Sequence, residues 1–145
     1  MTYQRILIGI DSSPCSFHAA KKGFTLAHQL NATVGLIFVI DQHKEITNPD
    51  LGITPQQSQS ILLQQAEESI EQLVKLYHES GDILRFTPEG YPKEQILITA
   101  KDWNADLIII GTHGRSGLAH LLMGSVAEHI IRHAQKPVMI VPEEH

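Results

Sequence analysis

Short runs of Ile, Leu and Val recur along this chain, and longer segments with helical spacing separate them. The runs are RILIGI, TVGLIFVI, ILRFTP, DLIIIG and PVMIV, at residues 5–10, 33–40, 83–88, 106–111 and 137–141. All but the third are almost continuously apolar. Strands of this kind occur when helices cover both faces of a parallel sheet. The pattern therefore predicts five buried strands, and this constrains the fold more than any other feature.

The segments between the runs place apolar residues three and four positions apart, as amphipathic helices do. The first predicted helix begins at Pro14, with Ser13 as its N-cap, and the second spans about residues 57–80. The third and fourth begin at Pro92 and Ser125. The residues expected to face inward are Phe17, Ala20, Phe24, Ala27, Leu62, Ala66, Ile70, Leu73, Tyr77, Ile96, Ala100, Val126, Ile130 and Ala134.

Five strands alternating with four helices predict an α/β fold, a single three-layer, doubly wound parallel sheet. The 145 residues fit one domain over positions 1–145. Residues 41–60 show no clear periodicity and are expected to form a loop or lid. Trp103 is expected to cover the edge of the core, and Cys15 to be packed inside it.

Ligands of doubly wound sheets bind outside the carboxyl ends of the strands, where the strand order reverses. Asp11, Val39 and Gly111 lie at such ends, and the segment GTHGRSGLAHLLMGS follows the fourth run. Glycines let a backbone approach an anion, and a helix N-terminus offers free N–H groups to phosphate. The segment has no Walker lysine, and no G-x-G-x-x-G follows the first strand.

A purely structural interpretation of this segment stays open. Ser125 and Glu128 form the S-x-x-E pattern of a capping box, which would explain the serine without a ligand. Gly111 is also a residue that ends strands. His113 lies inside the segment, and ligand contact and simple solvation are equally compatible with its position. His129 and His133 lie four residues apart without an evident third metal ligand, so we expect them to be exposed and unliganded.

Composition excludes several classes of protein. The formal net charge of −5 argues against a nucleic-acid partner, because such binding needs an excess of Lys and Arg. The single cysteine rules out an internal disulfide. No apolar run approaches the length of about 20 residues that spans a bilayer. The N-terminal residues do not resemble a signal peptide, so a cytoplasmic protein without a membrane partner is expected.

Gly111-x-x-Gly114, nine further residues and then Gly124-Ser125 match the G-2x-G-9x-G-[S/T] signature. In this the chain resembles the ATP-binding branch of the universal stress protein family, and RILIGIDSS, LIFVID and KPVMIV resemble its first, second and last strands. The resemblance implies the strand order 3-2-1-4-5 and a small cytoplasmic protein that binds ATP, or ADP or AMP, with Mg²⁺. It also implies a homodimer through Pro137 to Val141.

The resemblance further implies roles for individual residues. Val39 would contact adenine through its backbone, with Ile10 as an apolar wall, and Asp11 would lie near the ribose, the phosphates and Mg²⁺. The residues expected to line the phosphates are Gly111, His113, Gly114, Arg115, Gly124, Ser125 and Val126.

Three functions remain open from the sequence. The first is a regulatory, stress-linked ATP-binding module that changes the surface seen by a regulatory protein partner. The second is a slow ATPase or nucleotide hydrolase, with Asp11 and His113 orienting water and Arg115 offsetting charge. The third is an interaction protein that binds no nucleotide and uses its glycines structurally.

Overall fold

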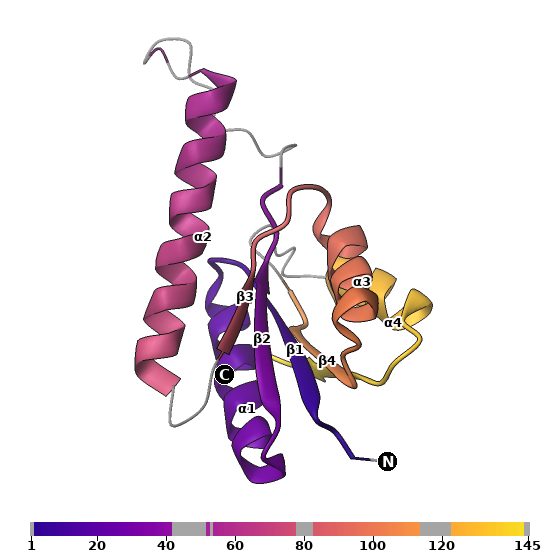
Figure 1. The fold of residues 1–145 in the computed structure, drawn as a ribbon. Helices are drawn as coiled ribbons and strands as arrows, with labels where there is room; N and C mark the ends of the chain where they lie inside the picture. Colours follow the sequence, from indigo (N-terminus) through magenta and orange to yellow (C-terminus); the bar gives the residue numbers. More distant parts are fainter. Residues whose placement is uncertain (1, 42–51, 53, 78–82, 114–122, 144–145) are drawn as a thin grey trace.

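The computed structural model describes residues 2–41, 52, 54–77, 83–113 and 123–143. Strands and helices alternate along the chain (Figure 1). The strands are β1 (Arg5–Ile10), β2 (Thr33–Phe38), β3 (Ile83–Phe86), β4 (Leu107–Gly111) and β5 (Val138–Val141). The helices are α1 (Pro14–Leu30), α2 (Pro55–Tyr77), α3 (Pro92–Trp103) and α4 (Ser125–His133). The predicted α/β class is confirmed.

All strand pairs of the sheet are parallel, and the strand order is β3-β2-β1-β4-β5. The chain runs outward from β1 to β2 and β3 and then returns to place β4 on the other side of β1. This is the order that the resemblance implied. The order reverses between β1 and β4, so the loops that follow these two strands lie at the switch point of the sheet.

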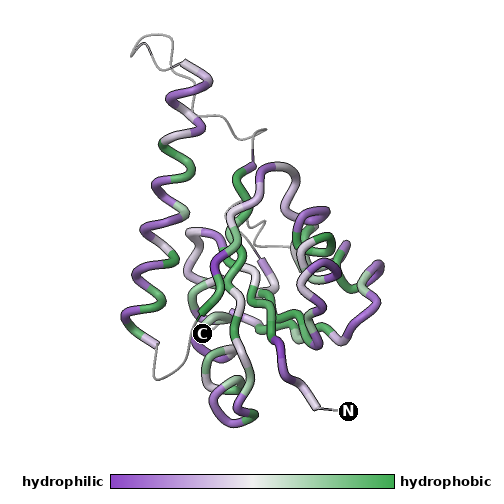
Figure 2. The backbone as a smooth tube through the Cα atoms, in the orientation of Figure 1, coloured by the Kyte–Doolittle hydropathy of each residue, from purple (hydrophilic) through white to green (hydrophobic). Residues whose placement is uncertain are grey.

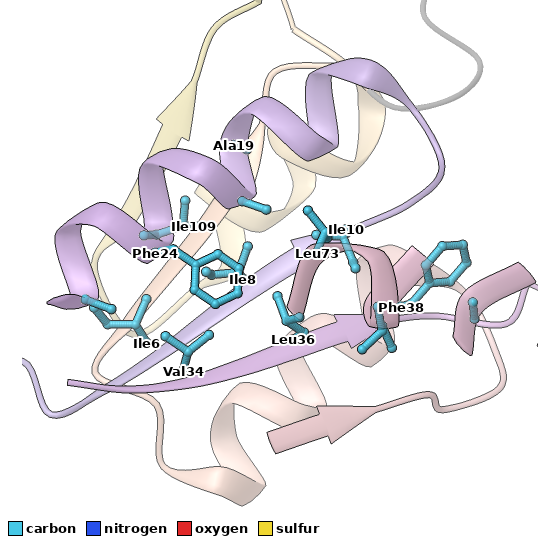
Figure 3. Close-up of a cluster of buried hydrophobic side chains, with 14 of the residues drawn as sticks. Ile6, Ile8, Ile10, Ala19, Phe24, Val34, Leu36, Phe38, Leu73 and Ile109 are labelled. Atoms are coloured by element: carbon cyan, nitrogen blue, oxygen red, sulfur yellow. The ribbon is translucent and has the colours of Figure 1, made fainter. Parts of the chain in front are cut away.

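Each strand contributes to two separate cores because successive side chains point to opposite faces. Ile6, Ile8 and Ile10 of β1 pack with α1 and α2 in one cluster, which Figure 3 shows in close-up. Leu7 lies in the second cluster, under α3 and α4. The hydrophobic residues therefore follow the strands almost continuously, whereas hydrophobic and hydrophilic residues alternate along α2 (Figure 2). This is the three-layer arrangement that the apolar runs predict.

Local signals account for both ends of α1. The Ser13 side chain accepts a hydrogen bond from the Ser16 N–H at 3.2 Å, which confirms Ser13 as the N-cap. At the other end Asn31 adopts a left-handed conformation with φ of 55°, and Asn104 ends α3 in the same way with φ of 61°. Asparagine tolerates this conformation better than most residues do. The turns into β2 and β4 are thus encoded locally.

The start of α2 differs from the prediction. The helix begins at Pro55, so the last part of the expected loop over residues 41–60 is helical, and the prediction was wrong there. Thr54 and Gln57 form a reciprocal capping box: the Gln57 N–H donates to Thr54 Oγ1 at 3.2 Å, and the Thr54 N–H donates to Gln57 Oε1 at 2.8 Å. Residues 42–51 and 53 lie outside the described residues.

Two contacts fix the ends of the sheet away from the switch point. The Asp106 carboxylate accepts hydrogen bonds from the backbone N–H groups of Gln4, at 2.8 Å, and Arg5, at 2.9 Å. These bonds lower the pKa of Asp106 because they favour the charged carboxylate. Trp103 covers the core edge as predicted, with its ring 5.7 Å from that of Phe86 and directly over Gly35. Together these contacts hold β1, β3 and β4 in place.

Candidate functional site

Asp11 occupies the switch point directly after β1, and its carboxylate shapes the turn into α1. The Ser13 N–H donates to Asp11 Oδ1 at 2.8 Å, and the Asp11 N–H donates to the Ser16 hydroxyl at 2.7 Å. The first turn of α1 thus holds the Asp11 backbone and one oxygen of its carboxylate. A half-buried carboxylate held in this way has a defined position at the ligand-binding edge of the sheet.

Gly111 ends β4 against the first turn of α1. A Cβ atom at this position would lie 2.8 Å from Cys15 Sγ and 3.2 Å from the Cys15 carbonyl oxygen, so only glycine fits without movement. Cys15 is buried, as expected, with its sulfur 3.7 Å from Thr112 Oγ1 and 4.0 Å from the Val141 carbonyl oxygen. The first glycine of the signature therefore has a packing role, whatever else it does.

Thr112 joins the two halves of the glycine-rich segment. Its carbonyl oxygen accepts the Gly124 N–H at 2.6 Å, and its own N–H donates to the Val141 carbonyl oxygen at 3.1 Å. The end of β4, the end of β5 and the start of α4 meet at this one residue. Sequence reasoning missed Thr112, and its position between Gly111 and His113 was the available signal. The structure thus brings Gly111 and His113 to the same place as Gly124 and Ser125.

The start of α4 differs from the predicted capping box. Gly124 is the N-cap and Ser125 is the first helical residue, with no side-chain capping bond. Glu128 instead binds Arg132 through an exposed salt bridge of 2.8 Å. The capping interpretation of Ser125 is therefore wrong, because a serine inside the helix cannot accept from the orphan N–H groups as an N-cap does. Ser125 is exposed at the positive end of the helix dipole.

Ile10 and Val39 lie at the carboxyl ends of neighbouring strands but belong to different faces of the sheet. The Ile10 side chain packs in the α1–α2 cluster and that of Val39 in the α3–α4 cluster, both about 7% exposed. Beyond Val39, Ile40 makes an isolated bridge with Glu89, which fixes the loop before α3 beside the end of β2. Their side chains serve the core, so a ligand at these strand ends would meet mainly backbone.

The structure describes some of the remaining predicted site residues and not others. Val126 is half-buried and packs against the α3–α4 core. His113 is half-buried, with its Nδ1 atom buried. Gly114 and Arg115 lie outside the described residues. Among the residues that the structure does describe, no three His, Cys, Asp or Glu side chains form a group that could hold a metal ion.

The fold and these contacts define an open, doubly wound α/β domain. Its candidate ligand-binding edge combines the Asp11 carboxylate, the end of β4 and the N-terminus of α4. The sequence model of the Universal stress protein family matches residues 2–142. The chain belongs to the universal stress protein family. Within the described helices, none has both the length and the apolar character needed to cross a membrane.

Relatives and solved structures agree with this assignment. The chain is 34% identical over 144 residues to the universal stress protein MJ0531 of Methanocaldococcus jannaschii, covering 96% of this chain and 82% of that protein. The solved structure of MJ0577, from the same organism, superposes with a TM-score of 0.86 at 27% identity and covers 100% of this chain and 99% of that one.

Two further solved structures of the same fold contain an adenine nucleotide. A universal stress protein in complex with cAMP has a TM-score of 0.69 at 22% identity and covers 98% of each chain. The universal stress protein of Archaeoglobus fulgidus in complex with dAMP has a TM-score of 0.62 at 18% identity, and covers 97% of this chain and 98% of that one.

Proposed function

We propose that this protein binds ATP, or ADP or AMP, at the switch point and acts as a regulatory module of the stress response in the cytoplasm. The observation that carries the proposal is the bond from the Gly124 N–H to the Thr112 carbonyl oxygen, 2.6 Å long. It joins the two glycine-containing segments beside Asp11 at the edge where folds of this class bind ligands. A regulatory protein partner would then read the nucleotide-bound surface.

The start of α4 supports a phosphate at this place. The first N–H groups of a helix lack intrahelical partners, and the dipole adds partial positive charge, so a helix N-terminus favours anions. Gly124 puts no Cβ beside those groups, and Ser125, the first helical residue, carries an exposed hydroxyl that can reach a phosphate oxygen. Solved structures of the same fold bind cAMP and dAMP, and these ligands have an adenine and a phosphate in common with ATP, ADP and AMP.

Mg²⁺ fits the residues present only as a partner of the nucleotide. Asp11 supplies a hard oxygen ligand, and Mg²⁺ is commonly held by one or two carboxylates together with substrate phosphates and water. Asp11 Oδ1 is engaged by the Ser13 N–H, which orients the carboxylate. Bound Mg²⁺ would neutralise phosphate charge, and Asp11 would hold it at the edge of the sheet.

We further propose a homodimer through Pro137 to Val141. β5 lies at one end of the sheet and pairs with β4 along a single edge. An uncovered strand edge is a template for pairing with another chain, and a second copy of β5 would cover it. Met139 on this strand is 36% exposed, which adds apolar surface to the contact.

The test begins with the nucleotide that remains bound to freshly purified protein, identified by mass spectrometry after denaturation. Titration calorimetry with Mg-ATP then compares the wild type with Ser125→Glu and Ser125→Ala. A glutamate in the first turn stabilises a helix by roughly 0.3–1 kcal/mol but repels phosphate. We expect Ser125→Glu to keep its melting temperature and to lose Mg-ATP affinity about tenfold or more, since a like-charge contact at about 4 Å costs between about 1 kcal/mol in water and about 4 kcal/mol near a protein surface.

Ser125→Ala is the matched control and should bind within about fivefold of the wild type, because one exposed hydrogen bond contributes roughly 0.5–1 kcal/mol. Equal Mg-ATP affinity in Ser125→Glu and the wild type would contradict a phosphate at the start of α4. If the purified wild type carries no bound nucleotide and also gives no heat on titration with Mg-ATP, the nucleotide-binding function as a whole is contradicted. The interaction-protein interpretation would then replace it.

A further inference from the structure

Helix α4 carries two histidines whose rings lie beside each other. His129 and His133 are four residues apart and therefore on the same side of the helix. Their ring centroids are 4.4 Å apart. His133 is exposed, as predicted, but His129 is half-buried, so the prediction of an exposed ring was wrong for His129. Metalloproteases use two histidines at this spacing on a helix as two of their zinc ligands.

The separation of the two rings suits a metal ion that both of them bind. The centre of a bound ring lies about 3.2 Å from the metal, because the metal–nitrogen bond is about 2.0–2.1 Å long and the nitrogen lies about 1.2 Å from the ring centre. Two rings bound at a right angle therefore have centres about 4.5 Å apart, and at the tetrahedral angle about 5.2 Å. The observed separation of 4.4 Å is close to the right-angle value.

The tilt of the rings also permits both of them to bind one ion. A ring nitrogen offers its lone pair in the plane of the imidazole, so a shared ion must lie where the two planes meet. The planes of His129 and His133 make an angle of 43° and therefore intersect, whereas parallel stacked rings could not share an ion in this way. Side-chain rotation of the exposed His133 is enough for the final adjustment.

The charges of α4 favour a cation at this place. His133 is in the last turn of the helix, where the helix dipole stabilises positive charge. Arg132, the residue before it, is paired with Glu128 in a salt bridge of 2.8 Å, which offsets the positive charge of the guanidinium. An ion bound between the two rings would therefore add its charge at the favourable end of α4.

We propose that His129 and His133 form a two-histidine chelate for a divalent transition-metal ion, Cu²⁺ or Ni²⁺. Imidazole suits both ions, and their tetragonal geometry places neighbouring ligands at right angles. No third side chain among the described residues completes a metal-binding group, so water fills the other positions. The chelate is separate from the proposed nucleotide site, because His133 is eight residues after Ser125, about 12 Å along the helix.

Bound metal would stabilise α4. The helix has nine residues, and helices this short are not stable alone in water. Only the folded helix brings the two rings together, and a ligand that binds the folded state preferentially stabilises it. We therefore expect saturating Ni²⁺ to increase the hydrogen-exchange protection of the α4 amides about tenfold in the wild type and by less than about twofold in His133→Gln.

The test measures Ni²⁺ binding by titration calorimetry at about pH 7.5, in the wild type, His129→Gln and His133→Gln. The wild type should bind one Ni²⁺ per chain at this site. Each variant should lose at least about tenfold in affinity, because a second ligand held in place by the same helix gains from its high effective concentration. A large excess of Mg²⁺ should not displace Ni²⁺, since Mg²⁺ prefers oxygen ligands.

The matched control keeps the number of histidines, of which the chain has nine. Ile131→His/His133→Gln moves the second imidazole to a position two residues after His129, which faces another side of the helix. Ile131 is 46% exposed, so the surface accommodates the imidazole. This variant should bind Ni²⁺ as weakly as His133→Gln does, because the ring count is unchanged and only the spacing differs.

Two results would overturn the chelate. One is a wild type that binds no Ni²⁺, and the other is equal Ni²⁺ affinity in the wild type and all three variants, which would show an adventitious ion only. His133→Gln changes an exposed residue and decides the question if His129→Gln does not fold. Mg-ATP binding should be the same in His133→Gln and the wild type, so failure of the chelate and failure of the proposed function are separate results.

Discussion

Replacement of Gly111 by alanine tests the contact that ties the end of β4 to α1. The added Cβ would meet Cys15 Sγ at 2.8 Å and the Cys15 carbonyl oxygen at 3.2 Å. The sulfur cannot easily move, because Thr112 and Val141 surround it. Overpacking of this kind costs about 1–3 kcal/mol. With a urea m-value of about 2 kcal/mol/M for a small domain, a loss of about 2 kcal/mol would lower the unfolding midpoint by about 1 M.

Cys15→Ala shows whether the predicted clash is the cause. This change removes the sulfur at 2.8 Å and leaves only the two backbone contacts of residue 15, at 3.2 and 3.4 Å. In the Cys15→Ala background we expect Gly111→Ala to cost about 1 kcal/mol or less, a coupling of the size that double-mutant cycles detect between residues in contact. Urea unfolding of the four proteins measures it. If Gly111→Ala lowers the free energy of unfolding equally in the wild-type and Cys15→Ala backgrounds, or does not lower it in the wild type, the packing role of Gly111 is refuted.

Three further predictions address the sheet, the dimer and the metal. Asp106→Ala should reduce stability at about pH 7 by roughly 1–2 kcal/mol, because it removes two charge-assisted hydrogen bonds. Since folding lowers the pKa of Asp106, urea unfolding should show the difference from the wild type shrinking as pH falls below 3.8. Met139→Glu should give a monomer by light scattering, whereas Leu76→Glu, on the exposed surface of α2, should stay dimeric. A wild-type protein that is itself monomeric would contradict the proposed dimer. Asp11→Asn keeps an acceptor for the Ser13 N–H and should bind ATP with little dependence on Mg²⁺ in calorimetry. If the wild type hydrolyses ATP and Asp11→Asn does not, the hydrolase function is favoured instead.

Much of the candidate site was predictable from local sequence. Asp11 follows an apolar run, and a residue in that position of a parallel sheet lies at the ligand-binding edge. The glycine-rich segment follows another run, which predicted that Gly111 and Ser125 flank the same place. The strand order came from the resemblance and not from periodicity, because alternating strands and helices are compatible with more than one order of a doubly wound sheet.

Other parts of the site were not predictable, because their reasons lie in distant residues. Ser125 has the spacing of a capping box with Glu128, yet the bond between Gly124 and Thr112 accompanies a helix that begins one residue earlier than a Ser125 cap would place it. The Thr54–Gln57 capping box was present in the sequence and was hidden because the polar residues 56–60 follow it before the next apolar side chain, Ile61. A local pattern shows that a helix can start, and tertiary contacts select the residue.

The sequence by itself determined the number, type and order along the chain of the strands and helices, because apolar spacing and end signals such as Ser13 and Asn31 act over a few residues. Only the tertiary structure decided that Gly111 must be a glycine because Cys15 lies against it, and that Trp103 packs over Gly35 beside Phe86. These are contacts between residues far apart in the chain. They depend on how complete elements pack, and no short stretch of sequence contains that information.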